Sequence, residues 1–149
     1  MSDPSKQDTE NDRDPTAASS RNSTLEDSGK LLLRLAVAGL MLFHGIAKLK
    51  GLDGIEKMLE GAGLPLFLAY GVYVGELIAP LLMIVGFWTR IASLVFAFNM
   101  LVAILLGHGN ELLSLNQYGG WAIELPMLFM LAAVSIALIG SGRFAVKPS

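Results

Sequence analysis

Four long apolar segments dominate the sequence and constrain its fold more than any other feature. They cover about residues 30–49, 64–87, 90–107 and 121–139. About 20 apolar residues in a helix span the hydrocarbon core of a bilayer. Stretches such as APLLMIVGFW and MLFMLAAVSIALIG have no polar face at helical spacing, which argues against a soluble bundle. The sequence therefore predicts an all-α, four-helix transmembrane bundle.

The composition excludes several kinds of site. Charged residues make up 16% of the chain, well below the share in soluble domains, and the net charge of −2 gives no reason to expect a nucleic-acid partner. The absence of cysteine excludes disulfides, thiolate metal sites and iron–sulfur clusters. The two histidines, His44 and His108, come without a haem or metal motif. We therefore expect no metal site and no covalently bound cofactor.

The chain divides into a tail and a membrane domain. Residues 1–29 are polar and lack periodic apolar positions, so we expect a disordered tail. Residues 30–146 form the predicted membrane domain. Between its first two spans, the stretch LDGIEKMLEGAG (residues 52–63) is suited to a short helix at the membrane interface.

The distribution of Lys and Arg predicts how the bundle is oriented. With four spans, both termini and the short link GFWTR lie on one side, which holds Arg21, Lys30, Arg34, Arg90, Arg143 and Lys147. The other side holds Lys48, Lys50 and Lys57. Because basic flanks favour the cytoplasm, we expect a multi-pass membrane protein with both termini cytoplasmic.

Two polar residues lie near the middle of predicted spans. Glu76 is deep in the second span, where an isolated carboxylate takes up a proton or finds a partner. Asn99 is near the middle of the third span and is a credible partner for it. Both a structural and a functional role remain open for Glu76, since ionisable groups in a membrane serve either.

Further ionisable residues are expected toward the outer half of the bundle, with Glu76 and Asn99 below them. Lys48 is expected to reach the outer lipid headgroups with its long side chain, and Arg34, at the opposite end of the first span, the inner ones. The candidate ligand-binding residues are His44, Lys48, Glu76, Asn99, His108 and Glu124. Gly71, Gly75 and Ala79, spaced four apart, predict a helix contact face, and Pro80 predicts a kink in the second span.

The sequence resembles the DoxX family of small bacterial membrane proteins over residues 31–145. The resemblance rests on LLRLAVAGLMLFHGIAKLKG, VGELIAPLLMIVGFWTRIASL and GGWAIELPMLFMLAAVSIALIGSGRF. It implies a four-helix membrane bundle in the bacterial cytoplasmic (inner) membrane. The family takes its name from a subunit associated with quinone-linked sulfur oxidation and terminal oxidase activity, and other members are linked to oxidative-stress complexes. The chain ends in GRFAVKPS, whereas the family often ends in GRYSLD.

Two functions from different classes follow. The first is a quinone-interacting subunit of a membrane oxidoreductase system, which needs a redox partner protein because the chain has no electron carrier of its own. The second is a non-catalytic scaffold or assembly factor, in which the polar residues hold the helices together. A lined cavity of a few hundred Å³ distinguishes the two. A homo-oligomer is left open, as is a small transporter, although the sequence has no obvious internal repeat.

The predicted orientation can be tested because the chain has no native cysteine. A cysteine introduced at Asn116 should react with an impermeant thiol reagent added to intact cells, whereas one introduced at Ser20 should react only after the cells are opened. The reverse labelling pattern would place both termini outside.

Overall fold

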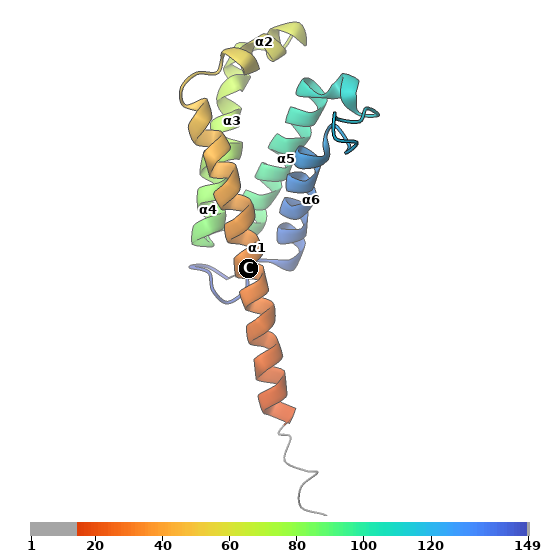
Figure 1. Ribbon diagram of the computed structural model, residues 1–149. Helices are drawn as coiled ribbons and strands as arrows, with labels where there is room; N and C mark the ends of the chain where they lie inside the picture. The colour runs from red at the N-terminus through yellow and green to blue at the C-terminus, as the bar shows by residue number, and fades with distance from the viewer. Residues whose placement is uncertain (1–14, 149) are drawn as a thin grey trace, which may run out of the picture.

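The computed structural model describes residues 15–148, and within this range every regular element is a helix. Figure 1 shows the helices side by side, with α2 across the end of the bundle away from the C-terminus. In chain order the elements are α1 (Pro15–Lys48), α2 (Asp53–Gly61), the 3₁₀ helix η2 (Leu66–Tyr70), α3 (Gly71–Tyr73), the π-helical segment η3 (Val74–Ile78), α4 (Ala79–Val85), α5 (Thr89–Gly107), the short 3₁₀ turn η4 (Gly109–Glu111) and α6 (Glu124–Ile139).

Three helical segments are long and apolar enough to cross a membrane: Asn22–Lys48, Leu66–Val85 and Thr89–Gly107. The fourth, α6, has 16 residues and is about 24 Å long at 1.5 Å per residue, shorter than the hydrocarbon core. Large apolar side chains are exposed around the whole bundle, including Phe43, Phe98 and Leu138. Such a surface is suited to lipid and not to water. The predicted four-helix membrane bundle is confirmed.

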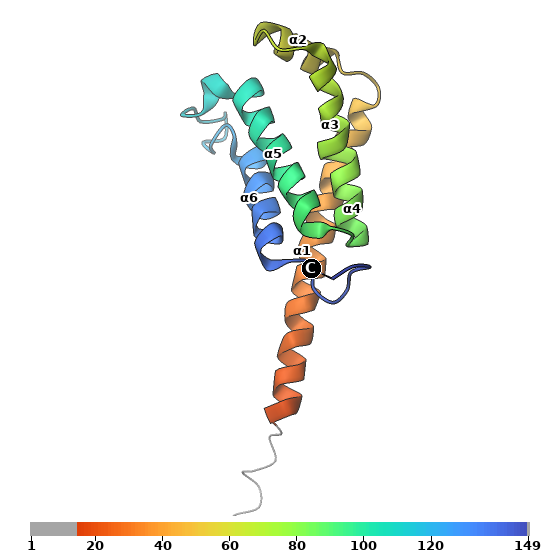
Figure 2. The same cartoon turned by 180° about the vertical axis from the view of Figure 1, so that it is seen from behind.

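The core lies where four helices meet. Helix α5 packs extensively on α6, and α1 packs against α4 and α6. Figure 2 shows α5 and α6 together on one side, with α3 and α4 on the other. The buried side chains at the centre include Met41, Met83, Phe96 and Ala133. A separate small cluster of Leu52, Leu59 and Ala69 fixes α2 to the start of the second span.

The second span is irregular around Pro80, as its sequence predicts. Pro80 lacks an N–H group and cannot donate to the carbonyl of Glu76, as the residue four positions later normally does. The segment before it widens into a π-helix, in which the Ala79 N–H donates to the Val74 carbonyl five residues back. Pro126 is the third residue of α6, where an N–H group has no partner in the helix anyway.

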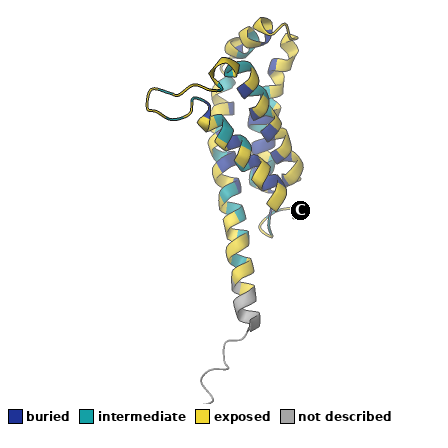
Figure 3. Ribbon diagram, turned by 90° about the vertical axis from the view of Figure 1, so that its right-hand side faces the viewer, coloured by how far each residue is buried: buried dark blue, intermediate teal, exposed yellow. Residues whose placement is uncertain are grey.

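Helix α1 begins within the predicted tail. Residues 15–29 are helical and continue into the first span, whereas residues 1–14 lie outside the described residues. Extending an existing helix is easier than starting one, and Pro15 suits a first helical position. Figure 3 shows residues 22–29 of α1 largely exposed below the bundle. This segment is attached through Asp27, whose carboxylate accepts a hydrogen bond from the Arg143 N–H.

The sequence predicts that Arg34 reaches the lipid headgroups, and this prediction is wrong. Its side chain is 1% exposed. Its two terminal nitrogens donate to the carbonyl oxygens of Ser141 (2.7 Å) and Phe144 (2.6 Å). These carbonyls lie just after the end of α6, where the backbone turns back toward Gly86. Because a planar guanidinium can hold two acceptors at once, Arg34 fastens the C-terminal segment (residues 140–148) beneath the bundle.

Removing this guanidinium should destabilise the protein. We expect Arg34→Met to lower the free energy of unfolding by about 2–4 kcal/mol, because it leaves two carbonyls without their charged donor. The control, Arg90→Met, changes an exposed residue at the start of α5 and should stay within about 0.5 kcal/mol. Thermal unfolding in detergent measures both. Equal effects of the two variants would contradict the role given to Arg34.

Candidate functional site

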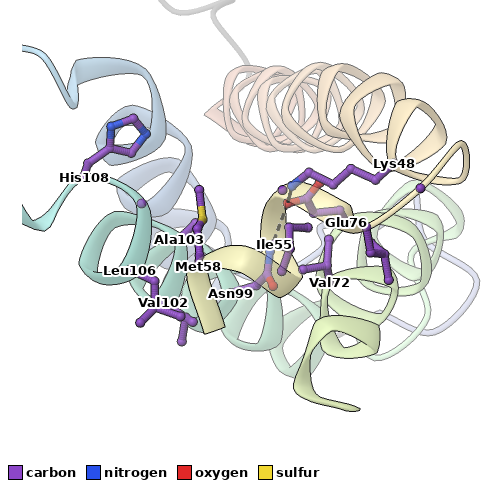
Figure 4. Close-up of a pocket in the computed structure, with 14 residues that line it drawn as sticks. Lys48, Ile55, Met58, Val72, Glu76, Asn99, Val102, Ala103, Leu106 and His108 are labelled. Carbon is purple, nitrogen blue, oxygen red and sulfur yellow. Dashed lines mark hydrogen bonds and ion pairs between the residues drawn. The ribbon is translucent and has the colours of Figure 1, made fainter. Parts of the chain in front are cut away.

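Glu76 is the centre of a polar contact between three helical segments. Its side chain, in the π-helical segment η3, is almost fully buried. Lys48 Nζ, from the end of α1, donates to Glu76 Oε1 at 2.5 Å. Asn99 Nδ2, from the middle of α5, donates to the same oxygen at 3.4 Å. Figure 4 shows Lys48 and Asn99 reaching Glu76 from different sides. The predicted pairing of Glu76 with Asn99 is therefore present.

Two glycines let the helices approach Glu76 closely. A Cβ atom at Gly45 in α1 would overlap the main-chain carbonyl oxygen of Glu76. A Cβ atom at Gly75 would overlap the side chain of Asn99. Because neither glycine carries a side chain, α1 and α5 can both pack directly against η3, as small residues allow in membranes. The predicted contact face thus holds at Gly75 and Ala79, which are buried, but not at Gly71, which is exposed.

Lys48 points inward to Glu76, so the prediction that it reaches the headgroups is wrong. About a third of its side chain remains exposed. The Tyr73 hydroxyl donates to the main-chain carbonyl of Lys48 at 3.3 Å and so holds the end of α1 against the second span. A buried carboxylate without a partner is costly, and the ammonium of Lys48 supplies that partner.

A cavity of about 370 Å³ lies beside this contact. Lys48, Glu76, Asn99 and His108 are its polar lining residues, and Ile55, Met58 and Val72 are among its apolar residues. The second carboxylate oxygen, Glu76 Oε2, is buried and accepts no hydrogen bond from any described residue. A buried polar atom without a partner is costly. The cavity is thus lined by a carboxylate with one unpaired oxygen and by the cation of Lys48.

His44 lies on the other side of the same ion pair. A smaller cavity of about 240 Å³ is lined by His44, Lys48 and Glu76 together with Met100 and Phe129. The imidazole packs edge-on against the Phe129 ring, and its Nδ1 is 3.3 Å from the Leu40 carbonyl. His44 thus shares a cavity with Glu76 without bonding to it.

The structure does not bring His108 and Glu124 into this contact. His108 pairs with the neighbouring Glu111, with Nδ1 2.8 Å from Oε2, although its side chain lines the edge of both cavities. Figure 4 shows it apart from Lys48 and Glu76. Glu124 is exposed in the first turn of α6, and its carboxylate lies against Gly120. The hydrogen-bonding partner of His108 is therefore Glu111, three residues along the chain, and not Glu76.

The sequence did not predict that α2 lines the cavity beside Glu76. Ile55 and Met58, both in α2, line the cavity of about 370 Å³, while Leu52 and Leu59 fix the helix in place. The signal was present, because the apolar residues of α2 recur three to four positions apart between charged ones. It marked an interfacial helix but gave no indication of what the helix covers.

Glu76→Ala tests the energetic weight of the ion pair. We expect the free energy of unfolding to fall by about 1–3 kcal/mol, because the charge of Lys48 loses its partner. The matched control, Glu124→Ala, removes an exposed carboxylate and should stay within about 0.5 kcal/mol. A double-mutant cycle between Lys48→Met and Glu76→Gln should show coupling above about 0.5 kcal/mol. Additive effects would contradict a direct interaction.

Comparison with known proteins identifies the family. The DoxX family model matches residues 29–109, a region that includes Lys48, Glu76 and Asn99 but not α6. The putative oxidoreductase CatD of Bacillus subtilis (strain 168) is 32% identical over 120 residues, covering 80% of this chain and 85% of that protein. The inner membrane protein YphA of Escherichia coli (strain K12) is 32% identical over 113 residues, covering 70% and 81%. No solved structure shows a significant match. The chain belongs to the DoxX family of membrane proteins.

Proposed function

We propose that this protein binds a quinone beside Lys48 and Glu76 and acts as a quinone-interacting subunit of a membrane oxidoreductase system. The observation that carries the proposal is that the buried Glu76 lines a cavity of about 370 Å³ while one of its carboxylate oxygens, Oε2, has no donor among the described residues. That volume is within the range of small-molecule sites. A scaffold that only pairs its polar residues would leave neither the cavity nor the free acceptor.

The polar atoms of the site match both redox states of a quinone. An ammonium group has three hydrogens to donate, and Lys48 uses one of them on Glu76 Oε1. The others are suited to a quinone carbonyl oxygen. Glu76 Oε2 is suited to accept from a hydroxyl group of the reduced form. The apolar side chains of Ile55 and Val72 are suited to the ring.

The redox balance requires a second protein. Reduction of a quinone to its hydroquinone takes two electrons and two protons. Glu76 and His44, which line cavities on the two sides of Lys48, are the groups placed to pass protons. The electrons would come from a redox partner protein. The description of CatD as a putative oxidoreductase supports this assignment.

We also propose that the protein lies in the bacterial cytoplasmic membrane with both termini cytoplasmic. YphA is described as an inner membrane protein. In the structure, Arg34, Arg143 and the C-terminal segment gather at the end of the bundle opposite α2. Lys48 forms an ion pair with Glu76, which further reduces the net positive charge at the α2 end of the bundle. The quinone site would then face the outer half of the membrane.

Mass spectrometry of organic extracts from the purified protein tests the proposed ligand. We expect a quinone in a nearly equimolar amount in the unmodified protein, and at least a tenfold loss of it in Glu76→Gln. His44→Ala should also lower retention, because His44 lines the neighbouring cavity. The matched control, Glu124→Gln, makes the same chemical change at an exposed position and should retain the quinone.

The alternative function predicts a different extract. If the protein is a scaffold or assembly factor, the extract should contain bulk lipid alone, and Glu76→Gln should leave its composition unchanged. That outcome would contradict quinone binding and leave Lys48, Glu76 and Asn99 as a purely structural contact.

A further inference from the structure

A third cavity, of about 500 Å³, adjoins the proposed quinone site. Its lining is apolar apart from Asn99 and includes Leu59 from α2, Leu68 and Val74 from the second span, and Phe98 from α5. This cavity and the cavity of about 370 Å³ at Glu76 share five lining residues, which are Ile55, Val72, Asn99, Val102 and Leu106. The polar contact at Glu76 and the apolar cavity therefore lie on either side of one row of residues.

Gly71 leaves this apolar cavity open. It lines the cavity, and a Cβ atom at this position would meet nothing within 4 Å. Gly75, one helical turn further on, packs against Asn99. The absence of a side chain at Gly71 therefore serves no helix contact. Its effect is to preserve space between the second span and α5.

The lining indicates what kind of group the space can hold. Apart from Asn99, whose amide already donates to Glu76, the lining side chains offer no hydrogen-bonding group. A polar occupant would lose its hydrogen bonds to water without replacement, whereas a hydrocarbon would lose nothing. The cavity also lies next to a site that holds the one buried carboxylate in the described part of the second span.

We propose that this apolar cavity, lined in part by Gly71, binds the hydrocarbon tail of the quinone whose head group lies at Lys48 and Glu76. The inference rests on the proposed function, because the head group fixes where the tail begins. The ligand then extends past Asn99, with its ring on the polar side and its tail between the second span and α5. Helix α2 covers both parts through Ile55, which lines both cavities.

Filling the cavity from Gly71 tests the inference. Gly71→Leu places a branched side chain in open space, and the backbone there has right-handed helical angles that Leu adopts readily. The control, Gly39→Leu, makes the same change in α1, also in open space but outside the cavity. If Gly71→Leu fails to fold, Val95→Phe fills the cavity from α5 instead.

Two quinones that share one head group distinguish the contribution of the tail to binding from that of the head group. One is a quinone with a long isoprenoid tail, and the other is the same ring without a tail. In a single detergent, we expect Gly71→Leu to weaken binding of the long-tailed quinone at least tenfold relative to the unmodified protein. Binding of the tail-less ring should change less than twofold. Gly39→Leu should leave both affinities unchanged.

The outcomes distinguish this inference from the proposed function. If the tail-less ring binds and is lost in Glu76→Gln, but the cavity-filling variant leaves the long-tailed quinone unaffected, the tail lies elsewhere and the inference is wrong. If neither quinone binds the unmodified protein, the proposed function itself fails. Equal weakening of both probes by Gly71→Leu would also overturn the inference, since it would show a general disturbance of the head-group site.

Discussion

The carboxylate of Glu76 lies near the middle of a membrane span, where a charge without a partner is too costly to keep. Its ion pair with Lys48 is the contact on which the arrangement of the bundle depends. Lys48 can reach Glu76 because α1 approaches η3 at Gly45, and Asn99 can reach it because α5 approaches at Gly75. One charge thus sets the close packing of three helical segments.

A second polar fastening lies at the opposite end of the same helix. Arg34 and Lys48 are both in α1, 14 residues apart, which is about 21 Å along the helix. Arg34 binds the carbonyls after α6, and Lys48 binds the carboxylate in the second span. Between them the contacts are apolar, with Met41 and Ala38 in the core. Helix α1 is therefore held by charged hydrogen bonds at two points and by apolar packing between them.

The membrane fold and the contact of Glu76 with Asn99 were predictable, because hydropathy marks the spans and depth restricts the partners of a buried carboxylate. The direction of Lys48 and Arg34 was not. A long basic side chain near a helix end can reach water or another helix, and the choice depends on acceptors far away in the sequence, such as Ser141. His108 could not be assigned either, since its partner, Glu111, belongs to a short turn that periodicity does not reveal.

The π-helical turn at Val74–Ile78 has the effect of one extra residue inserted into an α-helix. Each residue turns an α-helix by about 100°. The direction in which Glu76 points, toward Lys48, therefore depends on the number of residues between Gly71 and Pro80 as well as on their identity. A relative could keep every polar residue of this span and still lose their alignment through a single deletion. Among such proteins, spacing carries as much information as identity.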